Sequence, residues 1–222
     1  MSEHIVIIHS IEPVTHDVKR FRFDKPKDYS FTPGQATDVS VNKPEWKDEL
    51  RPFTFTSLNE DPWLEFTIKR YEDHHGVTDQ LHQLSPGDQL IIRDVWGAIE
   101  YKGPGYFIAG GAGITPFIAI LRKLKKDGQT EGNTLIFSNK TAADIIYEKE
   151  LKDILQNKAQ FILTRETRSG YTSTRIDKMF FEKNTLDYTK HFYICGPDEM
   201  IKDISGLLEG LGAKTDSVVF EK

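Results

Sequence analysis

The hydrophobic pattern of this chain changes its period near residue 102, and this change sets the strongest limit on its fold. In the first hundred residues, apolar and polar side chains alternate over short stretches, as in WLEFTIKRY at 63–71. There the apolar residues at 64, 66 and 68 share one face, and the polar residues at 65, 67 and 69 share the other. Similar runs rich in β-branched or aromatic residues occupy 36–41, 51–58 and 88–94. Closely spaced strands of this kind predict an antiparallel sandwich or small β-barrel over residues 1–101.

After the KGPG of 102–105, strand-like and helix-like segments alternate. Strands are expected at 106–110, 133–138, 159–164 and 191–196. Helices are expected at 116–128, 142–157, 172–183 and 197–212. This repetition predicts an α/β domain over residues 102–222, with a parallel sheet covered by helices on both faces.

The composition argues against several classes of site. Cys195 is the only cysteine, so the chain can form neither an intramolecular disulfide nor a cysteine-ligated iron–sulfur cluster. Histidines and carboxylates do not recur at metal-ligand spacing, so we expect no metal. Residues 1–101 carry 11 Lys and Arg against 18 Asp and Glu, and the remainder carries 18 against 16, giving −7 and +2. This balance disfavours nucleic-acid binding.

Targeting signals are not evident in the sequence. No stretch approaches the roughly 20 apolar residues that span a membrane. The N-terminal MSEHIVIIHSIEP lacks the basic start and small-residue cleavage site of a secretory signal. We therefore expect no membrane insertion and a cytoplasmic location, while the oligomeric state is left open.

A glycine-rich turn follows the first strand of the second half, in YFIAGGAGITPFIAIL at 106–121. The third position of the usual G-x-G-x-x-G pattern is Pro116, which suits the first turn of a helix. Thr115 is then expected at or near the N-cap, where its hydroxyl can accept a backbone N–H. The basic residues of 122–126 are expected to complement the negative end of the helix. Such a turn can place a pyrophosphate at the helix N-terminus, or it can be a ligand-free junction between buried elements.

Short motifs distributed along the chain resemble those of the ferredoxin–NADP reductase superfamily of flavoproteins. They are PGQ at 33–35, RPFTFTS at 51–57, GVT at 76–78, PGD at 86–88, GGAGITP at 110–116 and CGPDEM at 195–200. Their order and spacing match that family from about residue 3 to the end of the chain. The resemblance implies that residues 1–101 form an FAD-binding barrel and residues 102–222 an NAD(P)-binding domain.

The resemblance assigns a flavin site to the first half. Arg51 would pair with the flavin pyrophosphate, for which a guanidinium fork is suited. Phe53, at the family's tyrosine position beside Pro52, would lie against the isoalloxazine ring, and Thr54 would place its hydroxyl near flavin N5. A second phosphate-binding turn, which favours FAD over FMN, would comprise Gly76, Val77 and Thr78, with Thr78 capping a short helix. For Thr67, Ile68 and Lys69, contact with the ribose and adenine side and ordinary strand packing are both open.

The resemblance also assigns a dinucleotide site to the second half. The glycine turn would bind the pyrophosphate through Gly111, Gly113, Thr115 and Pro116. Cys195 would face the nicotinamide, with Gly196, Pro197 and Met200 beside it, at the carboxyl edge where ligands of open α/β sheets gather. Thr164 and Arg165, with Arg168, offer donors for a 2′-phosphate, and no acid stands at the NAD-specific position, so NADPH is favoured and NADH remains possible. Phe220 and Glu221, from the C-terminal tail, are candidates near the flavin. The expected catalytic residues are therefore Thr54 and Cys195, from the two assigned sites, together with Glu221.

The implied reaction is an oxidoreduction that converts two-electron chemistry into single-electron steps. Hydride passes from NADPH to FAD, and electrons then leave for a separate carrier such as ferredoxin or flavodoxin. One enzymatic alternative is an NAD(P)H-dependent flavin or ferric reductase, or the reductase component of an oxygenase. A third possibility is a catalytically silent nucleotide-binding module.

Overall fold

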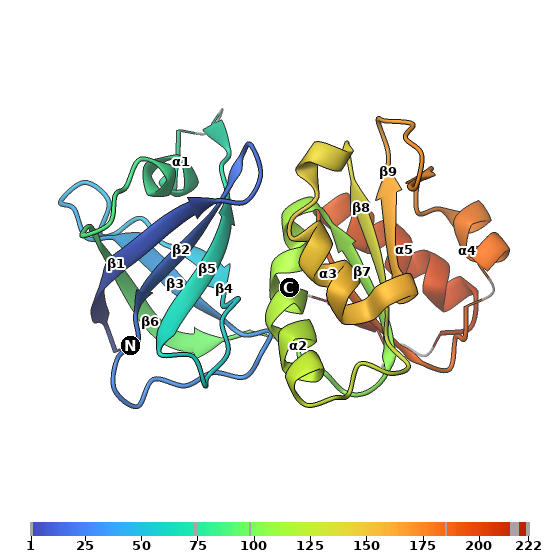
Figure 1. Cartoon of the computed structure of the whole chain (residues 1–222), viewed down its shortest axis with the longest axis horizontal. Helices are drawn as coiled ribbons and strands as arrows, with labels where there is room; N and C mark the ends of the chain where they lie inside the picture. The colour runs from blue at the N-terminus through green and yellow to red at the C-terminus, as the bar shows by residue number, and fades with distance from the viewer. Residues whose placement is uncertain (1, 73–74, 98, 185, 214–217, 221–222) are drawn as a thin grey trace.

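A computed structural model describes residues 2–72, 75–97, 99–184 and 186–213, and the backbone of 218–220. Figure 1 shows two lobes side by side, an N-terminal β-barrel and a C-terminal α/β domain, with helix α2 at their junction. Within the described part, no helix is long and apolar enough to cross a membrane.

The N-terminal lobe is an antiparallel sheet in the order β4-β3-β6-β1-β2-β5. The strands are β1 (His4–Pro13), β2 (Val18–Asp24), β3 (Ala36–Val41), β4 (Arg51–Thr54), β5 (Trp63–Lys69) and β6 (Gln89–Trp96). Phe55, just after β4, pairs with Phe66 of β5 and so joins the two outer strands. The predicted barrel is therefore confirmed, although its β1–β2 hairpin was not among the ranges expected from the sequence.

Aromatic side chains fill the interior of the barrel. Phe21, Phe55 and Phe66 have no exposed surface, and the rings of Phe31 and Phe55 stack 4.3 Å apart. The short helix α1 (Val77–His82) contributes Val77 and Leu81 to this core. The inward face of β5 thus matches the alternation seen in the sequence.

The C-terminal lobe is a parallel sheet in the order β10-β9-β8-β7-β11-β12. Its strands are β7 (Gly105–Gly110), β8 (Thr134–Asn139), β9 (Ala159–Leu163), β10 (Thr172–Ser173), β11 (His191–Cys195) and β12 (Val218–Phe220). Helices α2 (Thr115–Lys126) and α3 (Glu148–Leu155) bury apolar residues with one face of the sheet. Helices α4 (Lys178–Asn184) and α5 (Asp198–Gly210) lie toward the other. This layering confirms the α/β prediction.

Two of the expected helices are wrong in extent. The segment 142–157 begins with a single 3₁₀ turn, η3 (Ala142–Asp144), which the Thr141 and Asp144 side chains close as a capping box. Tyr147 then adopts a left-handed conformation, with φ 52° and ψ 37°, and α3 begins only after it. The segment 172–183 likewise opens with β10, and its helix begins at Lys178.

The two lobes share apolar packing. Val18 of the barrel and Ile99 of the connecting segment belong to the same buried cluster as α2 and the parallel sheet. Gly34, with φ +101°, lies so close to the Ile99 carbonyl oxygen that a Cβ there would be 2.2 Å away. The connecting segment is thus packed against the barrel at a point where only glycine fits.

Candidate functional site

Two adjoining cavities lie where the barrel faces the carboxyl edge of the parallel sheet. The first, the α/β cavity, has a volume of about 610 Å³ and is lined by the glycine turn, the end of β8 and the turn after β11. The second, the barrel cavity, has a volume of about 300 Å³ and is lined by residues of β4, β5 and α1. Both cavities are lined by Lys69, Tyr71, Ala112 and Thr115, so they meet along these four residues.

The glycine turn forms the floor of the α/β cavity. Strand β7 ends at Gly110, a 3₁₀ turn, η2, spans Gly111–Ile114, and α2 begins at Thr115 with Pro116 in its first turn. Thr115 lies next to the N-cap, as expected, but the expectation that its hydroxyl accepts a backbone N–H there is wrong. Ile114 occupies that position, and the Thr115 hydroxyl donates to the Ala112 carbonyl oxygen at 3.0 Å. The Thr115 hydroxyl therefore bonds to the 3₁₀ turn that precedes α2 and does not cap the helix.

The glycines of this turn have different roles. A Cβ at Gly113 would lie 2.3 Å from the Cys195 carbonyl oxygen, and one at Gly110 would lie 2.5 Å from Met200 Sδ. These two glycines therefore allow the turn to pack against the segment after β11. Gly111 has φ +52°, and no described atom lies within 4 Å of a Cβ placed there. Of the three, Gly111 is the one that borders open space.

The CGP segment lies beside the glycine turn, as the sequence predicts. Cys195 is the last residue of β11, is 5% exposed and pairs in register with Ala109 of β7. Gly196 and Pro197 follow it directly before α5, and Met200 stands in the first turn of that helix. All four residues line the α/β cavity.

Most of the predicted flavin residues come together at the barrel cavity. Its wall includes Pro52, Phe53 and Thr54 of β4, the β5 residues from Thr67 to Lys69, and Thr78. Trp96, which is 40% exposed, and Tyr71, which is 46% exposed, also line it, and sequence reasoning missed both. In the sequence, the only sign that these two residues could belong to a site was their aromatic character at or just beyond the end of a strand. The Lys69 ammonium is paired with Asp17 at 2.9 Å.

Arg51, Gly76 and Val77 are not among the residues that line this cavity, and Thr78, which does line it, differs from its expected role. Among the described residues, Arg51 lies outside the barrel cavity, and its exposed guanidinium donates from Nη1 to the Leu50 carbonyl oxygen at 2.6 Å. Val77 is buried in the barrel core. The expectation that Thr78 caps α1 is wrong, because Gly76 is the N-cap and Thr78 lies inside the helix. Its hydroxyl instead accepts the Tyr71 backbone N–H at 3.4 Å.

The residues predicted to bind a 2′-phosphate are divided between two cavities. Thr164 lines the α/β cavity and donates its hydroxyl to the Asn139 carbonyl oxygen at 3.2 Å. Arg165 and Arg175 line another cavity of about 330 Å³, which Thr164 also lines, so this cavity meets the α/β cavity at Thr164. Glu221 and the side chain of Phe220 lie outside the described residues, while the Phe220 backbone pairs with Ile194.

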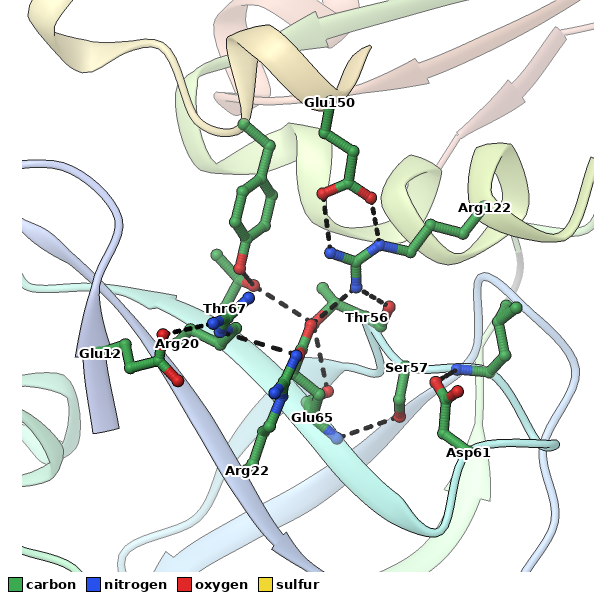
Figure 2. Close-up of polar contacts among 12 residues, drawn as sticks. Glu12, Arg20, Arg22, Thr56, Ser57, Asp61, Glu65, Thr67, Arg122 and Glu150 are labelled. Atoms are coloured by element: carbon green, nitrogen blue, oxygen red, sulfur yellow. Dashed lines mark hydrogen bonds and ion pairs between the residues drawn. The ribbon is translucent and has the colours of Figure 1, made fainter. Parts of the chain in front are cut away.

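A buried ion network joins the barrel to α2 and α3 (Figure 2). The Glu65 carboxylate of β5, whose residue is 1% exposed, accepts hydrogen bonds from Arg122 Nη1 at 2.7 Å and from Arg22 Nε at 2.9 Å. Arg122 also donates two hydrogen bonds to Glu150, at 2.6 and 2.9 Å, and one to the Thr56 carbonyl oxygen. The sequence-based expectation for Arg122 is therefore wrong, because it binds the buried carboxylate of Glu65 and the half-buried one of Glu150 rather than complementing the end of its helix.

The network controls the protonation of Glu65. Burial alone would raise the pKa of this carboxyl, but the charge of Arg122 and hydrogen bonds from Arg122, Arg22 and Thr56 outweigh it. The net effect lowers the pKa of Glu65 below its ordinary value. Glu65 is accordingly held as a carboxylate at neutral pH.

Thr67 connects this network to the barrel cavity. Its hydroxyl lies 3.2 Å from that of Thr56 and 3.1 Å from the Tyr147 hydroxyl, across the junction. The Arg122 guanidinium lies over the Tyr147 ring, 5.3 Å from its centroid. A wall of the barrel cavity is thus hydrogen-bonded to the α/β domain.

One group of possible metal ligands occurs in the described part of the chain. His16, Asp17 and Asp144 have ligand atoms within 4.8 Å of one another, although Asp144 is distant in sequence from the other two. Asp17 already pairs with Lys69, and Asp144 accepts from Thr141 at 2.7 Å. The absence of a metal stays a prediction.

Comparisons with known families match both halves of the chain. Residues 6–101 match the oxidoreductase FAD-binding domain, and residues 107–206 match the oxidoreductase NAD-binding domain.

Several curated proteins are similar over most of the chain. NADH-cytochrome b5 reductase 2 of Coccidioides immitis is 31% identical, over 88% of this chain and 66% of its own length. The protein of that name from Candida glabrata is 30% identical, over 86% and 70%. The reductase component of propane 2-monooxygenase from Rhodococcus jostii is 26% identical, over 96% and 61%. The chain thus spans about two thirds of the length of these relatives.

Solved structures share the fold. The cytochrome b5 reductase domain of Ulva prolifera nitrate reductase superposes with a TM-score of 0.85 at 23% identity, covering 99% of this chain and 97% of that one. A ferredoxin NADP⁺ reductase from Neisseria gonorrhoeae, with bound FAD and NADP, gives a TM-score of 0.85 at 20% identity, covering 100% and 98%.

The ion network generates a prediction for stability. Arg122→Ala leaves Glu65 and Glu150 without their shared partner, and we expect it to lower the free energy of unfolding by about 3–5 kcal/mol. Urea unfolding at neutral pH measures this change. The matched control is Lys123→Ala, the next residue of α2, whose exposed ion pairs should leave the midpoint almost unchanged. Equal effects of the two substitutions would contradict the role given to Arg122.

The lowered pKa of Glu65 predicts how stability depends on pH. The unfolded chain binds a proton at Glu65 more readily than the folded chain does, so this stabilisation is complete above the ordinary carboxyl value of 4.5. It is lost as the pH falls through the lower folded pKa. Between pH 7 and pH 3, the free energy of unfolding of wild type should therefore fall more steeply than that of Glu65→Gln. Parallel pH profiles would rule out this linkage.

Proposed function

The chain belongs to the ferredoxin–NADP reductase superfamily of flavoproteins, and on this premise we propose that it is an NADH-dependent reductase that passes electrons to a separate carrier. In this proposal residues 1–101 bind FAD and residues 102–222 bind the dinucleotide. The observation that carries it is the meeting of the two cavities along Lys69, Tyr71, Ala112 and Thr115. Bound FAD would supply a hydride acceptor that can release electrons singly.

The barrel cavity fits a flavin by the chemistry of its wall. Phe53 and Trp96 offer aromatic surfaces for a flat ring system, and Thr54 offers a hydroxyl. We propose that Arg51 exchanges its contact with the Leu50 carbonyl for the flavin pyrophosphate, which a guanidinium fork binds well. The first turn of α1, from Gly76 to Thr78, is the proposed second phosphate contact.

The α/β cavity fits a dinucleotide. The open space beside Gly111 lies at the start of α2, a twelve-residue helix whose N-terminus favours a pyrophosphate. We propose that Cys195, Gly196 and Pro197 shape the nicotinamide subsite next to this turn. These residues orient the ring toward the barrel cavity, so the contribution of the chain is distance and orientation.

The choice of NADH departs from the sequence-based expectation of NADPH. The names of the relatives from Coccidioides immitis and Candida glabrata specify NADH. Arg165 is not among the residues that line the α/β cavity, but it lines a cavity that meets it at Thr164, so its position does not by itself favour either coenzyme. Asp144 lines the α/β cavity and would disfavour a 2′-phosphate, whereas Lys69 and Lys140 of the same wall carry the opposite charge, so the names of the relatives carry the choice of NADH.

For the acceptor, we propose a protein electron carrier on another chain. The relatives are named for cytochrome b5 and for a propane monooxygenase, which favours a haem protein or an oxygenase component over the ferredoxin or flavodoxin expected from the sequence. The exposed rings of Trp96 and Tyr71 at the barrel cavity offer an apolar contact for such a partner.

The cofactor assignments predict different defects for two arginine variants. Arg51→Ala should reduce FAD retention by about tenfold, because it removes a charge-assisted phosphate contact. Lys43→Ala, which removes an exposed charge after β3 that lines neither cavity, is the control. Fluorescence titration of released FAD measures the effect. An unchanged affinity in Arg51→Ala would remove this residue from the flavin site.

Arg165→Ala should leave the ratio of kcat/KM for NADH and NADPH unchanged, with wild type preferring NADH. Arg175→Ala, from the same cavity, is the matched control. If Arg165→Ala specifically lost the use of NADPH, Arg165 would be a 2′-phosphate ligand as the sequence predicted, and the proposed preference for NADH would be contradicted.

The reaction itself is tested by reduction of the purified flavoprotein and transfer to defined acceptors. When NADH is mixed with the flavoprotein in a stopped-flow instrument, the visible absorbance of the flavin should disappear during mixing or shortly afterwards. Cytochrome b5, a ferredoxin, a flavodoxin, free flavin and ferric citrate are then compared at equal concentration. Turnover with free flavin or ferric citrate alone would favour the flavin or ferric reductase alternative, and a colourless protein that cannot bind FAD would sink the proposal.

A further inference from the structure

Tyr147 directly precedes helix α3, and its backbone adopts a conformation that is unfavourable for a tyrosine. Its φ of 52° and ψ of 37° lie in the left-handed region, which is costly for a residue with a large side chain. It occupies the N-cap position without a side-chain hydrogen bond to the helix. Glycine or asparagine would suit this position better on local grounds, because both tolerate the left-handed region and both are favoured N-caps. The contacts that hold a tyrosine here must therefore lie outside its own helix.

These contacts reach across the domain junction. The Tyr147 hydroxyl lies 3.1 Å from the hydroxyl of Thr67 in β5, and the Tyr147 ring lies against the Arg122 guanidinium. Thr67 lines the barrel cavity, whereas Tyr147 is not among the described residues that line either that cavity or the α/β cavity. Tyr147 can thus act on the wall of the barrel cavity through Thr67 without touching a ligand.

The hydrogen bonds beyond Thr67 determine which hydroxyl donates. The Thr56 hydroxyl donates to Glu65, whose carboxylate oxygen lies at 3.0 Å and whose carbonyl oxygen lies at 3.3 Å, because neither oxygen carries a proton. Thr67 is then the donor in its 3.2 Å contact with Thr56. A hydroxyl has one proton, so Thr67 accepts from Tyr147 in the remaining contact. Burial raises the pKa of the Tyr147 hydroxyl, which keeps this donor protonated at neutral pH.

We propose that Tyr147 is a positioning residue for hydride transfer from NADH to FAD, the step that oxidises the first and reduces the second. Its hydroxyl holds Thr67, and with it one wall of the barrel cavity, in a fixed place relative to the α/β domain. The rate of hydride transfer depends steeply on the distance and angle between the reacting groups, whereas each cofactor is bound by contacts within its own cavity. This inference rests on the proposed function, and it adds a residue that the sequence motifs did not include.

The test is Tyr147→Phe in the FAD-loaded full chain, which removes the hydroxyl and keeps the ring beside Arg122. Stopped-flow reduction over a range of NADH concentrations separates the limiting rate of flavin reduction from the dissociation constant of NADH. The limiting rate should fall about tenfold, because a small displacement of the reacting groups is costly. The dissociation constants of NADH and FAD should not change. The matched control is Tyr171→Phe, which removes a hydroxyl that donates to Glu148 of its own lobe at 2.7 Å and should leave the limiting rate at the wild-type value.

Hydrogen exchange of the chain without cofactors provides a readout that does not depend on activity. The backbone amides of β5 should exchange about fivefold faster in Tyr147→Phe than in wild type, as expected when the strand loses one hydrogen bond. Tyr171→Phe should leave the exchange of β5 unchanged. Unaltered exchange of β5 in Tyr147→Phe would contradict the proposed hold on Thr67.

A double substitution tests whether Tyr147 acts through Thr67. Thr67→Val removes the accepting hydroxyl from the barrel side of the contact. Adding Tyr147→Phe to Thr67→Val should slow flavin reduction no further, because residues that act through one shared contact are not additive. Effects that multiply would show that Tyr147 acts by another route and would overturn the inference.

The outcomes separate this inference from the proposed function. A wild-type limiting rate in Tyr147→Phe overturns the inference alone, and a lower melting temperature beside it would make the hydroxyl merely structural. Weaker binding of NADH or FAD at an unchanged limiting rate also overturns it. A wild-type protein that binds FAD and is not reduced by NADH overturns the proposed function and this inference with it.

Discussion

The buried contact between Glu65 of the barrel and Arg122 of α2 determines how the two halves of the chain meet. Glu65 is buried, and Arg122 reaches across to it and to the Thr56 carbonyl oxygen of the barrel while it also binds Glu150 of its own lobe. Buried ion pairs add little net stability, but separating one leaves an unpaired charge at a cost of about 3–5 kcal/mol. The network therefore selects one relative placement of the domains, and in that placement the two cavities adjoin.

Strand β5 explains how this junction is coupled to the candidate site. Its apolar face, with Leu64 and Phe66, fills the barrel. Its polar face is also buried, because Glu65 binds Arg122 and the Thr67 hydroxyl contacts Tyr147. Thr67 and Lys69 of that same face reach the barrel cavity. One short strand thus supports the core, the domain junction and the site.

The sequence predicted the features that local patterns encode. The period of two in the first hundred residues and the strand–helix repeat after residue 102 predicted both sheets, because each reflects which faces are buried. Tyr147 shows where local patterns fail, since its left-handed conformation interrupts a segment with helical periodicity. The prediction for Arg122 fails for another reason. Its charge suits the end of its helix, whereas its partner Glu65 lies 57 residues away and has no local signal. The clustering of site motifs followed from the resemblance, but the placement of Arg165 in a second cavity, which shares Thr164 with the α/β cavity, depends on loop geometry after β9.

The contact between Gly113 and Cys195 has a consequence for redesign of this protein. With a Cβ at position 113 only 2.3 Å from the Cys195 carbonyl oxygen, the two turns form a single mechanical unit that no side chain can enter. Directed evolution of coenzyme preference would consequently find few tolerated substitutions at this seam, the contact between Gly113 and Cys195. Lys140 and Thr164, on the opposite margin of the same cavity, offer a mutational route that leaves the seam intact.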